Sequence, residues 1–198
     1  MPQMTSPKEL FVHELQDIYY AERQLTRVLP TLATEATDRE LTKAFQKHLT
    51  ETREQVENLE QVFKNIGRRA EGQSCPGIDG IKKEHDEFMQ ENEPSTPVRD
   101  VFLTGAASRA EHYEIAAYTG LIEQARALGE RDSVKLLQEN LRQEKEALKT
   151  VESISKRILK ATKPTTRRST SRSTGTRSST RASSRRTTAK RPRRRAST

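Results

Sequence analysis

Four long segments of the sequence place apolar residues at the three- and four-residue spacing of a single helical face. Ser6 begins the first segment as an N-cap, followed by proline and, three residues after the cap, by a glutamate that completes a capping box. We expect a helix over 8–36. A second capping box that starts at Thr37 predicts a helix over 38–67, which Gly67 ends in a left-handed conformation. The very short turn between these two helices makes them antiparallel neighbours.

A second helical hairpin is expected over 97–128 and 133–160, with Thr96 as the cap of its first helix. The segment between the two hairpins is rich in glycine and proline, but its run 78–89 predicts a short extra helix. This crossover of about 30 residues can run the length of a helix of roughly 28 residues, about 40 Å. The fold class is therefore all-α, a four-helix bundle with one long crossover, which is the ferritin-like connectivity.

The composition of the chain changes abruptly near residue 163. Residues 163–198 contain 13 Lys or Arg, 17 Ser or Thr and no acidic residue, whereas residues 1–162 have a net charge of −5. We therefore expect one folded domain over 1–162 and a disordered basic tail over 163–198. No run approaches the roughly 18 apolar residues of a membrane helix, and no secretory signal begins the chain, so we expect a cytoplasmic protein without membrane contact. The single Cys75 excludes an internal disulfide, and we expect it to be an ordinary loop residue.

Each long helix carries a glutamate on its apolar stripe, close to the helix midpoint. These residues are Glu22, Glu51, Glu111 and Glu144. They lie within about 2.5 residues of the midpoints, or roughly 4 Å along the axis, so all four can meet at one level. Clustered buried carboxylates repel each other and cost several kcal/mol each in desolvation unless a cation compensates them. An oxygen-rich site of this kind suits a pair of iron or manganese ions.

Two further side chains are expected to join this site. His48 precedes Glu51 by about one helical turn, and Glu114 follows Glu111 by one turn. His112 adjoins Glu111, but a lone histidine on this face is more often a hydrogen-bonded core residue than a ligand. The predicted metal ligands are Glu22, His48, Glu51, Glu111, Glu114 and Glu144. A solvated face remains the alternative for each, because a shift of one position on the helical wheel turns a side chain toward water.

Five segments resemble the YciE/YciF-like family, a stress-associated bacterial branch of the ferritin-like superfamily. They are DIYYAERQL, HLTETREQVENLEQVF, SCPGIDGIKKE, AEHYEIAAY and LRQEKEAL, within about residues 6–160. The resemblance implies a ferritin-like bundle with a dimetal centre on these glutamates, usually in a cytoplasmic homodimer. In the wider superfamily, two helices carry Glu-x-x-His, but here Glu51 is followed by Glu54 and Glu144 by Ala147. The last helix therefore lacks a nitrogen ligand, and standard ferroxidase chemistry does not follow from the resemblance.

The basic tail predicts binding to nucleic acid through phosphate contacts. Its candidate contact residues are Arg167, Arg168, Arg172, Arg177, Arg181, Arg185, Arg186, Lys190, Arg191, Arg193, Arg194 and Arg195. No aromatic residue interrupts them, so base stacking is absent and we expect nonspecific binding of DNA or RNA. The alternative is a solubilising tail, or one that folds back on the acidic body.

Two hypotheses about function follow from these features. The first is a nucleoid-associated stress-response protein whose dimetal centre consumes oxidants or binds iron, tethered to nucleic acid by its tail. Whether such a centre turns over as an enzyme is left open. The second is a non-enzymatic architectural protein whose bundle serves only to dimerise.

Overall fold

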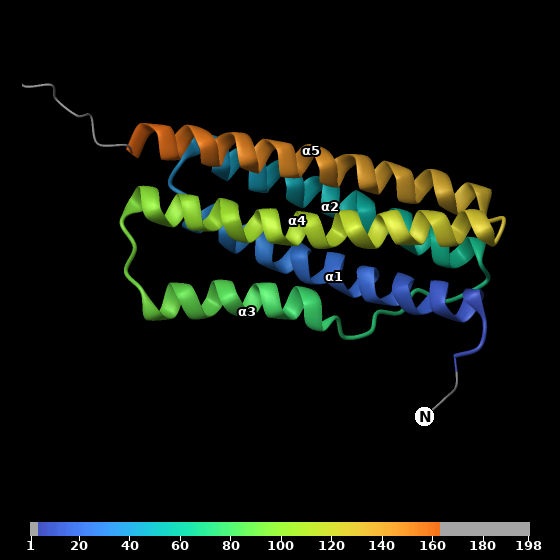
Figure 1. The fold of residues 1–198 in the computed structure, drawn as a ribbon. Helices are drawn as coiled ribbons and strands as arrows, with labels where there is room; N and C mark the ends of the chain where they lie inside the picture. Colours follow the sequence, from blue (N-terminus) through green and yellow to red (C-terminus); the bar gives the residue numbers. More distant parts are fainter. Residues whose placement is uncertain (1–3, 163–198) are drawn as a thin grey trace, which may run out of the picture. The chain divides into compact units, whose positions relative to one another are not determined.

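The computed structural model describes residues 4–162, which form five helices and no strand (Figure 1). The helices are α1 (Pro7–Glu35), α2 (Arg39–Asn65), α3 (Pro76–Glu91), α4 (Thr96–Ala127) and α5 (Arg131–Thr162). The predicted all-α fold with two helical hairpins and one long crossover is confirmed. The crossover contains α3, which is longer than the run 78–89 that we expected. The basic residues 163–198, with their predicted disorder, lie outside the described part of the chain.

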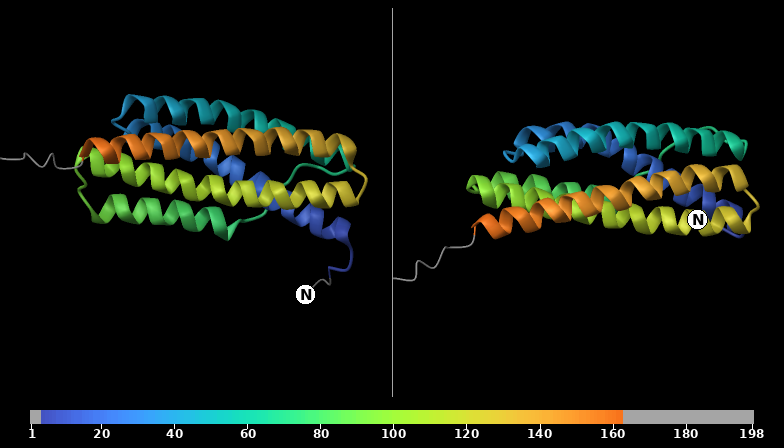
Figure 2. Two further views of the ribbon diagram at one scale, coloured as in Figure 1. Left: turned by 45° about the horizontal axis from the view of Figure 1, so that its top comes forward. Right: turned by 90° about the horizontal axis from the view of Figure 1, so that it is seen from above.

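The four long helices form the bundle, and α3 lies outside their ring. Each hairpin is antiparallel, α2 packs against α5, and α1 packs against α4. Because the crossover returns along the bundle, α2 and α4 run in the same direction (Figure 1). Helix α3 lies along α4 and α1, as the views in Figure 2 show. Within residues 4–162, no helix has the length and apolar character that crossing a membrane requires.

The starts of the helices follow the capping signals, with two corrections. At α1, Ser6 Oγ accepts a hydrogen bond from the Glu9 amide (3.2 Å), and the Glu9 carboxylate accepts one from the Ser6 amide (3.0 Å). At α2, the cap is Asp38 rather than Thr37, because the Asp38 carboxylate accepts from two amides of the first turn. At α4, Ser95 rather than Thr96 occupies the cap position, and its side chain makes no capping hydrogen bond.

A buried aspartate of α4 holds the turn between α1 and α2, which explains why Thr37 is not the cap. Asp100 is 3% exposed. Its carboxylate accepts hydrogen bonds from the Thr37 amide (2.8 Å), the Thr37 hydroxyl (2.5 Å) and the Asp38 amide (3.0 Å). The two hairpins are therefore joined at this end of the bundle by hydrogen bonds as well as by apolar packing.

The start of α3 is held by a polar cluster around the single cysteine. Cys75 is the N-cap residue of α3 and is fully buried. Its sulfur lies 2.9 Å from the Tyr113 hydroxyl, which also donates a hydrogen bond to Asp17 of α1. Gly77 is required here, because a Cβ atom at this position would lie 2.6 Å from the Tyr113 ring. Cys75 thus has a definite role in docking the crossover helix, which the sequence did not indicate.

Replacing Asp100 should destabilise the fold without affecting any site chemistry. Asp100→Ala leaves the buried donors of Thr37 and Asp38 without their acceptor, so we expect a loss of about 2–3 kcal/mol in the free energy of unfolding. Urea unfolding followed by circular dichroism measures this loss. The control is Asp132→Ala on α5, because Asp132 is exposed and, within residues 4–162, its ion pair is with Lys135. Equal stability of the two variants would contradict the role of Asp100.

Candidate metal centre

A layer of polar side chains crosses the middle of the bundle, between two apolar ends. Its ionisable members are contributed by all four long helices and are at most 6% exposed. They are Glu22 of α1, His48 of α2, Glu111 and Glu114 of α4, and Glu144 of α5. The layer exists because the rise of 1.5 Å per residue brings these positions to one level.

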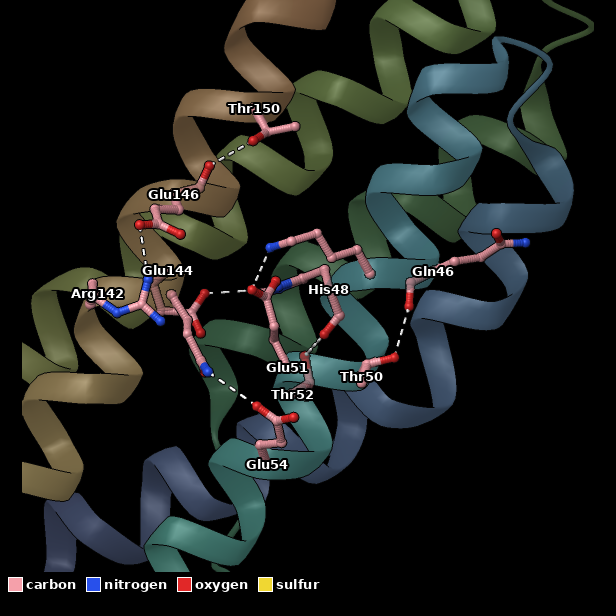
Figure 3. Close-up of polar contacts among 12 residues, drawn as sticks. Gln46, His48, Thr50, Glu51, Thr52, Glu54, Arg142, Glu144, Glu146 and Thr150 are labelled. Carbon is pink, nitrogen blue, oxygen red and sulfur yellow. Dashed lines mark hydrogen bonds and ion pairs between the residues drawn. The ribbon is translucent and has the colours of Figure 1, made fainter.

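Four of these residues converge on one point. His48 Nε2 lies 3.3 Å from a Glu111 carboxylate oxygen and 3.8 Å from a Glu144 oxygen. Together with Glu114, they offer four ligand atoms that lie within 4.8 Å of one another. Ligands around an ion at about 2.1 Å are separated by up to roughly 4.2 Å, so small side-chain movements would bring these atoms into coordination distance. Figure 3 shows Glu144 of α5 facing His48 and Glu51 of α2.

Most of the oxygen atoms in this layer have no partner. Among the described residues, neither oxygen of Glu114 accepts a hydrogen bond, and one oxygen each of Glu22, Glu111 and Glu144 is also unpartnered. Buried polar atoms are rarely left in this state, because each one costs its full desolvation energy. Besides these carboxyl oxygens, His48 Nδ1 and the side-chain oxygen of Gln55 are also unpartnered within residues 4–162. This donor set fits a metal cation that prefers oxygen ligands with one imidazole nitrogen.

The electrostatics of the metal-free layer lead to the same conclusion. Burial raises the pKa of Glu22 well above its usual value, and the charge of Glu144 adds to this effect. The pKa values of Glu111 and Glu114 are also raised well above the usual range, first by burial and then by neighbouring carboxylates. These carboxyl groups therefore keep protons at a pH where an exposed glutamate has lost them. A bound cation would take the place of those protons.

A ring of neutral hydrogen-bond donors orients two of the carboxylates. The Gln55 amide donates to one oxygen of Glu144, and the Tyr118 hydroxyl donates to one oxygen of Glu22. The Asn140 side-chain amide in turn donates to the Tyr118 hydroxyl (3.0 Å) and to the backbone carbonyl of Gln55 (3.3 Å). Burial raises the pKa of Tyr118, so it remains a phenol that donates. Glu144 and Glu22 are each left with one oxygen for a ligand.

The remaining predicted site residues lie at the edge of the layer or outside it. Glu51 forms an ion pair with Lys47, its side chain is 14% exposed, and it does not belong to the four-donor group. The structure places it in a small crevice between α2 and α5, beside Thr150, with His48 and Glu111 at the inner end. His112 is exposed and points away from the site. The predicted nucleic-acid contacts, residues 167–195, lie outside the described residues.

Sequence reasoning missed the residues that support the layer. Gln55 and Asn140 are fully buried amides, and Tyr118 is a fully buried phenol. Their polar groups occur on apolar stripes, and this pattern could have indicated buried hydrogen-bonding residues. Nothing in the sequence shows which glutamate each one contacts.

Comparisons with known proteins place the chain in a family. Residues 6–163 match the family described as "Domain of unknown function (DUF892)". Protein YciF of Escherichia coli K12 is 39% identical over 143 residues, which cover 72% of this chain and 86% of that protein.

Solved structures have the same fold. The structure of the E. coli stress protein YciF matches with a TM-score of 0.75 and 35% identity, over 79% of this chain and 99% of that chain. YcfI of Rhodopseudomonas palustris matches with a TM-score of 0.74 and 42% identity, over 76% of this chain and 96% of that chain. A protein of Xanthomonas campestris, at 21% identity and a TM-score of 0.61, shares the fold. The predicted resemblance is thus confirmed, and the chain belongs to the DUF892 family of YciF-like proteins.

Proposed function

We propose that the protein binds iron or manganese in the buried layer and uses the bound metal to consume an oxidant or to sequester iron. The observation that carries this proposal is the convergence of His48, Glu111, Glu114 and Glu144, whose carboxylates include four unpartnered buried oxygens. A purely structural layer would have its buried acceptors satisfied. Replacing one of these ligands and measuring the metal content is therefore the decisive experiment.

The four converging residues would hold the first ion. Glu22 keeps one free oxygen, and Glu51 lies at the edge of the layer, so these two carboxylates would complete a second position. When bound, such ions supply Lewis-acid and one-electron redox chemistry toward oxidants. The side chains around the ions would have three further roles. Gln55 and Tyr118 hold their carboxylates in one orientation, the glutamates release protons as the cation enters, and the apolar ends exclude water.

The distribution of charge supports a second function, the binding of nucleic acid. Residues 163–198 carry 13 basic residues without any acid, while residues 1–162 are net acidic. We propose that the tail binds DNA or RNA nonspecifically and tethers a homodimer of the bundle to the nucleoid. E. coli YciF is described as a stress protein, and we extend a stress-related role to this chain. The alternative is an architectural protein that binds no metal, and the experiments below distinguish it from a metal-binding protein.

Removing one buried carboxylate should lower metal binding and stabilise the metal-free fold. We expect Glu114→Gln and Glu144→Gln to weaken metal affinity at least tenfold, because each replaces a charged ligand with a neutral amide. The metal-free variants should be as stable as the wild type or more so, since an amide cannot ionise and the repulsion among the clustered carboxyl groups is reduced. Elemental analysis and urea unfolding measure the two effects.

The matched control for this pair is Glu123→Gln, an exposed position on α4 that pairs with Arg126. It should change neither metal content nor stability. Metal at wild-type levels in both Glu114→Gln and Glu144→Gln would refute the proposed site.

The raised pKa values of Glu22, Glu111 and Glu114 predict how stability depends on pH. The folded protein holds these protons more tightly than the unfolded chain, whose glutamates titrate near about 4.3. Their contribution to stability is therefore complete below that pH and is lost as the pH rises through the raised folded values. Metal-free protein should become less stable as the pH rises above about 4.3 toward the raised folded values, whereas metal affinity should increase.

Urea unfolding at several pH values with a chelator measures the first trend, and calorimetry in buffers of different ionisation enthalpy counts the protons released by metal. A Glu22→Gln Glu114→Gln double variant should lose most of the pH dependence. Stability of the metal-free wild type that does not change over this range would contradict the assignment.

Deleting residues 163–198 should abolish most affinity for DNA and leave the bundle and its metal intact. If about half of the basic residues neutralise phosphates, the slope of log affinity against log salt should be roughly −6 for the full chain. Binding titrations at several salt concentrations measure this slope. Exchange of the tail arginines for lysine should preserve much of it, because the charge is unchanged. Equal affinity of the truncated protein would place the binding surface on the bundle instead.

A further inference from the structure

An apolar cavity lies beside the candidate metal centre, beneath the crossover helix. It has a volume of about 40 Å³ and lies between α1, α3 and α4, partly open to solvent. Leu25 and Leu29 of α1, Ile78 of α3, and Ala107 and Ala110 of α4 line its walls. The space exists because α4 presents small alanine side chains where α1 and α3 converge on it. Its surface is almost entirely carbon.

The inner end of the cavity is formed by two of the proposed metal ligands. His48 and Glu111 both line it, and both are at least nine-tenths buried. Among the described residues, His48 Nδ1 and one Glu111 oxygen have no hydrogen-bond partner. The cavity therefore leads from beneath α3 directly to groups that would hold a metal ion.

The ionisable groups at the outer end are already occupied by other contacts. Asp79 accepts a hydrogen bond from the Tyr20 hydroxyl (3.1 Å), and Lys82 pairs with Asp86. His85 lies 2.8 Å from the carboxylate of Glu35. The walls thus offer little to a ligand that needs hydrogen bonds, and a polar molecule would lose its bonds to water without replacement.

The size and polarity of the cavity select its occupant. An apolar pocket gives water few hydrogen bonds and favours apolar molecules, and a volume of about 40 Å³ admits only a molecule of a few atoms. We propose that the cavity binds dioxygen next to His48 and Glu111, and that dioxygen rather than peroxide is the oxidant that reaches the centre. The role of dioxygen as oxidant rests on the proposed metal site, whereas its binding in the cavity does not require a metal.

The pocket on the α2 and α5 side of the centre differs by containing charge. This crevice also ends at His48 and Glu111, and its lining includes the charged pair of Lys47 and Glu51 beside apolar side chains. Charged or polar species are better accommodated there. Two routes of different polarity thus end at the same two residues, and this separation favours an uncharged apolar molecule as the occupant beneath α3.

Xenon is the probe for the cavity, used with the full-length metal-free protein. We expect xenon-pressurised crystals to contain one xenon atom between Leu29 and Ala107. Ala107→Leu should fill the space and abolish this binding. Ala116→Leu adds the same side chain at an exposed position of α4 and should leave xenon binding unchanged. A well-folded wild type without xenon, or xenon retained in Ala107→Leu, would overturn the inference. Because metal is absent, these outcomes are independent of the metal site.

A second variant and a second measurement test the choice of oxidant. Val28→Phe narrows the cavity from a partly exposed position, so it serves where Ala107→Leu does not fold. In protein loaded with iron to wild-type content, either variant should slow oxidation by dioxygen about tenfold. Oxidation by hydrogen peroxide should be unchanged. Equal slowing with both oxidants would refute the assignment of the cavity to dioxygen, whatever the xenon result.

Discussion

The rest of the structure depends on the cost of keeping several carboxylates out of water. An apolar core would be simpler to build, yet each long helix contributes an acid or a histidine to one buried level. Such a layer is unfavourable by itself, because burial and mutual repulsion raise the pKa values of Glu22, Glu111 and Glu114. The apolar layers at both ends of the bundle must therefore provide the stability that the middle removes. A stable apolar frame around a destabilising polar layer is typical of a preorganised binding site.

Neutral hydrogen-bond donors around the layer restrict the orientation of two of the buried carboxylates. Gln55, Tyr118 and Asn140 are linked by hydrogen bonds that end at Glu144 and Glu22. A carboxylate fixed in this way needs little reorganisation when a cation arrives. Glu114 has no such partner on either oxygen, so its orientation depends on packing alone. The layer thus combines two oriented ligands with one that is free to adjust.

The sequence was sufficient for the fold and for the level of the site, for definite physical reasons. Helix spacing and caps have local causes, so the predicted helix ends agree with the structure to within about two residues. The position of Glu22 or Glu144 along the bundle axis follows from the fixed rise per residue of a helix. Rotation about the helix axis is not fixed in this way, so the position of Glu51 at the edge could not be foreseen. Contacts such as those of Asp100 with Thr37, 63 residues away, depend on tertiary packing and have no local signature.

The peripheral position of α3 affects how easily the side of the bundle beneath it opens to solvent. The ring of four long helices closes without it, and α3 is held by a few contacts, which include the Cys75–Tyr113 pair and the stacked rings of Phe88 and Phe102. Its local opening therefore costs less free energy than global unfolding, and its amides should exchange hydrogen faster than those of the ring. Small gases need no permanent tunnel in such a protein. A small molecule that binds in the proposed cavity would enter through local opening of α3, while the proposed ligands and the core around them stay in place.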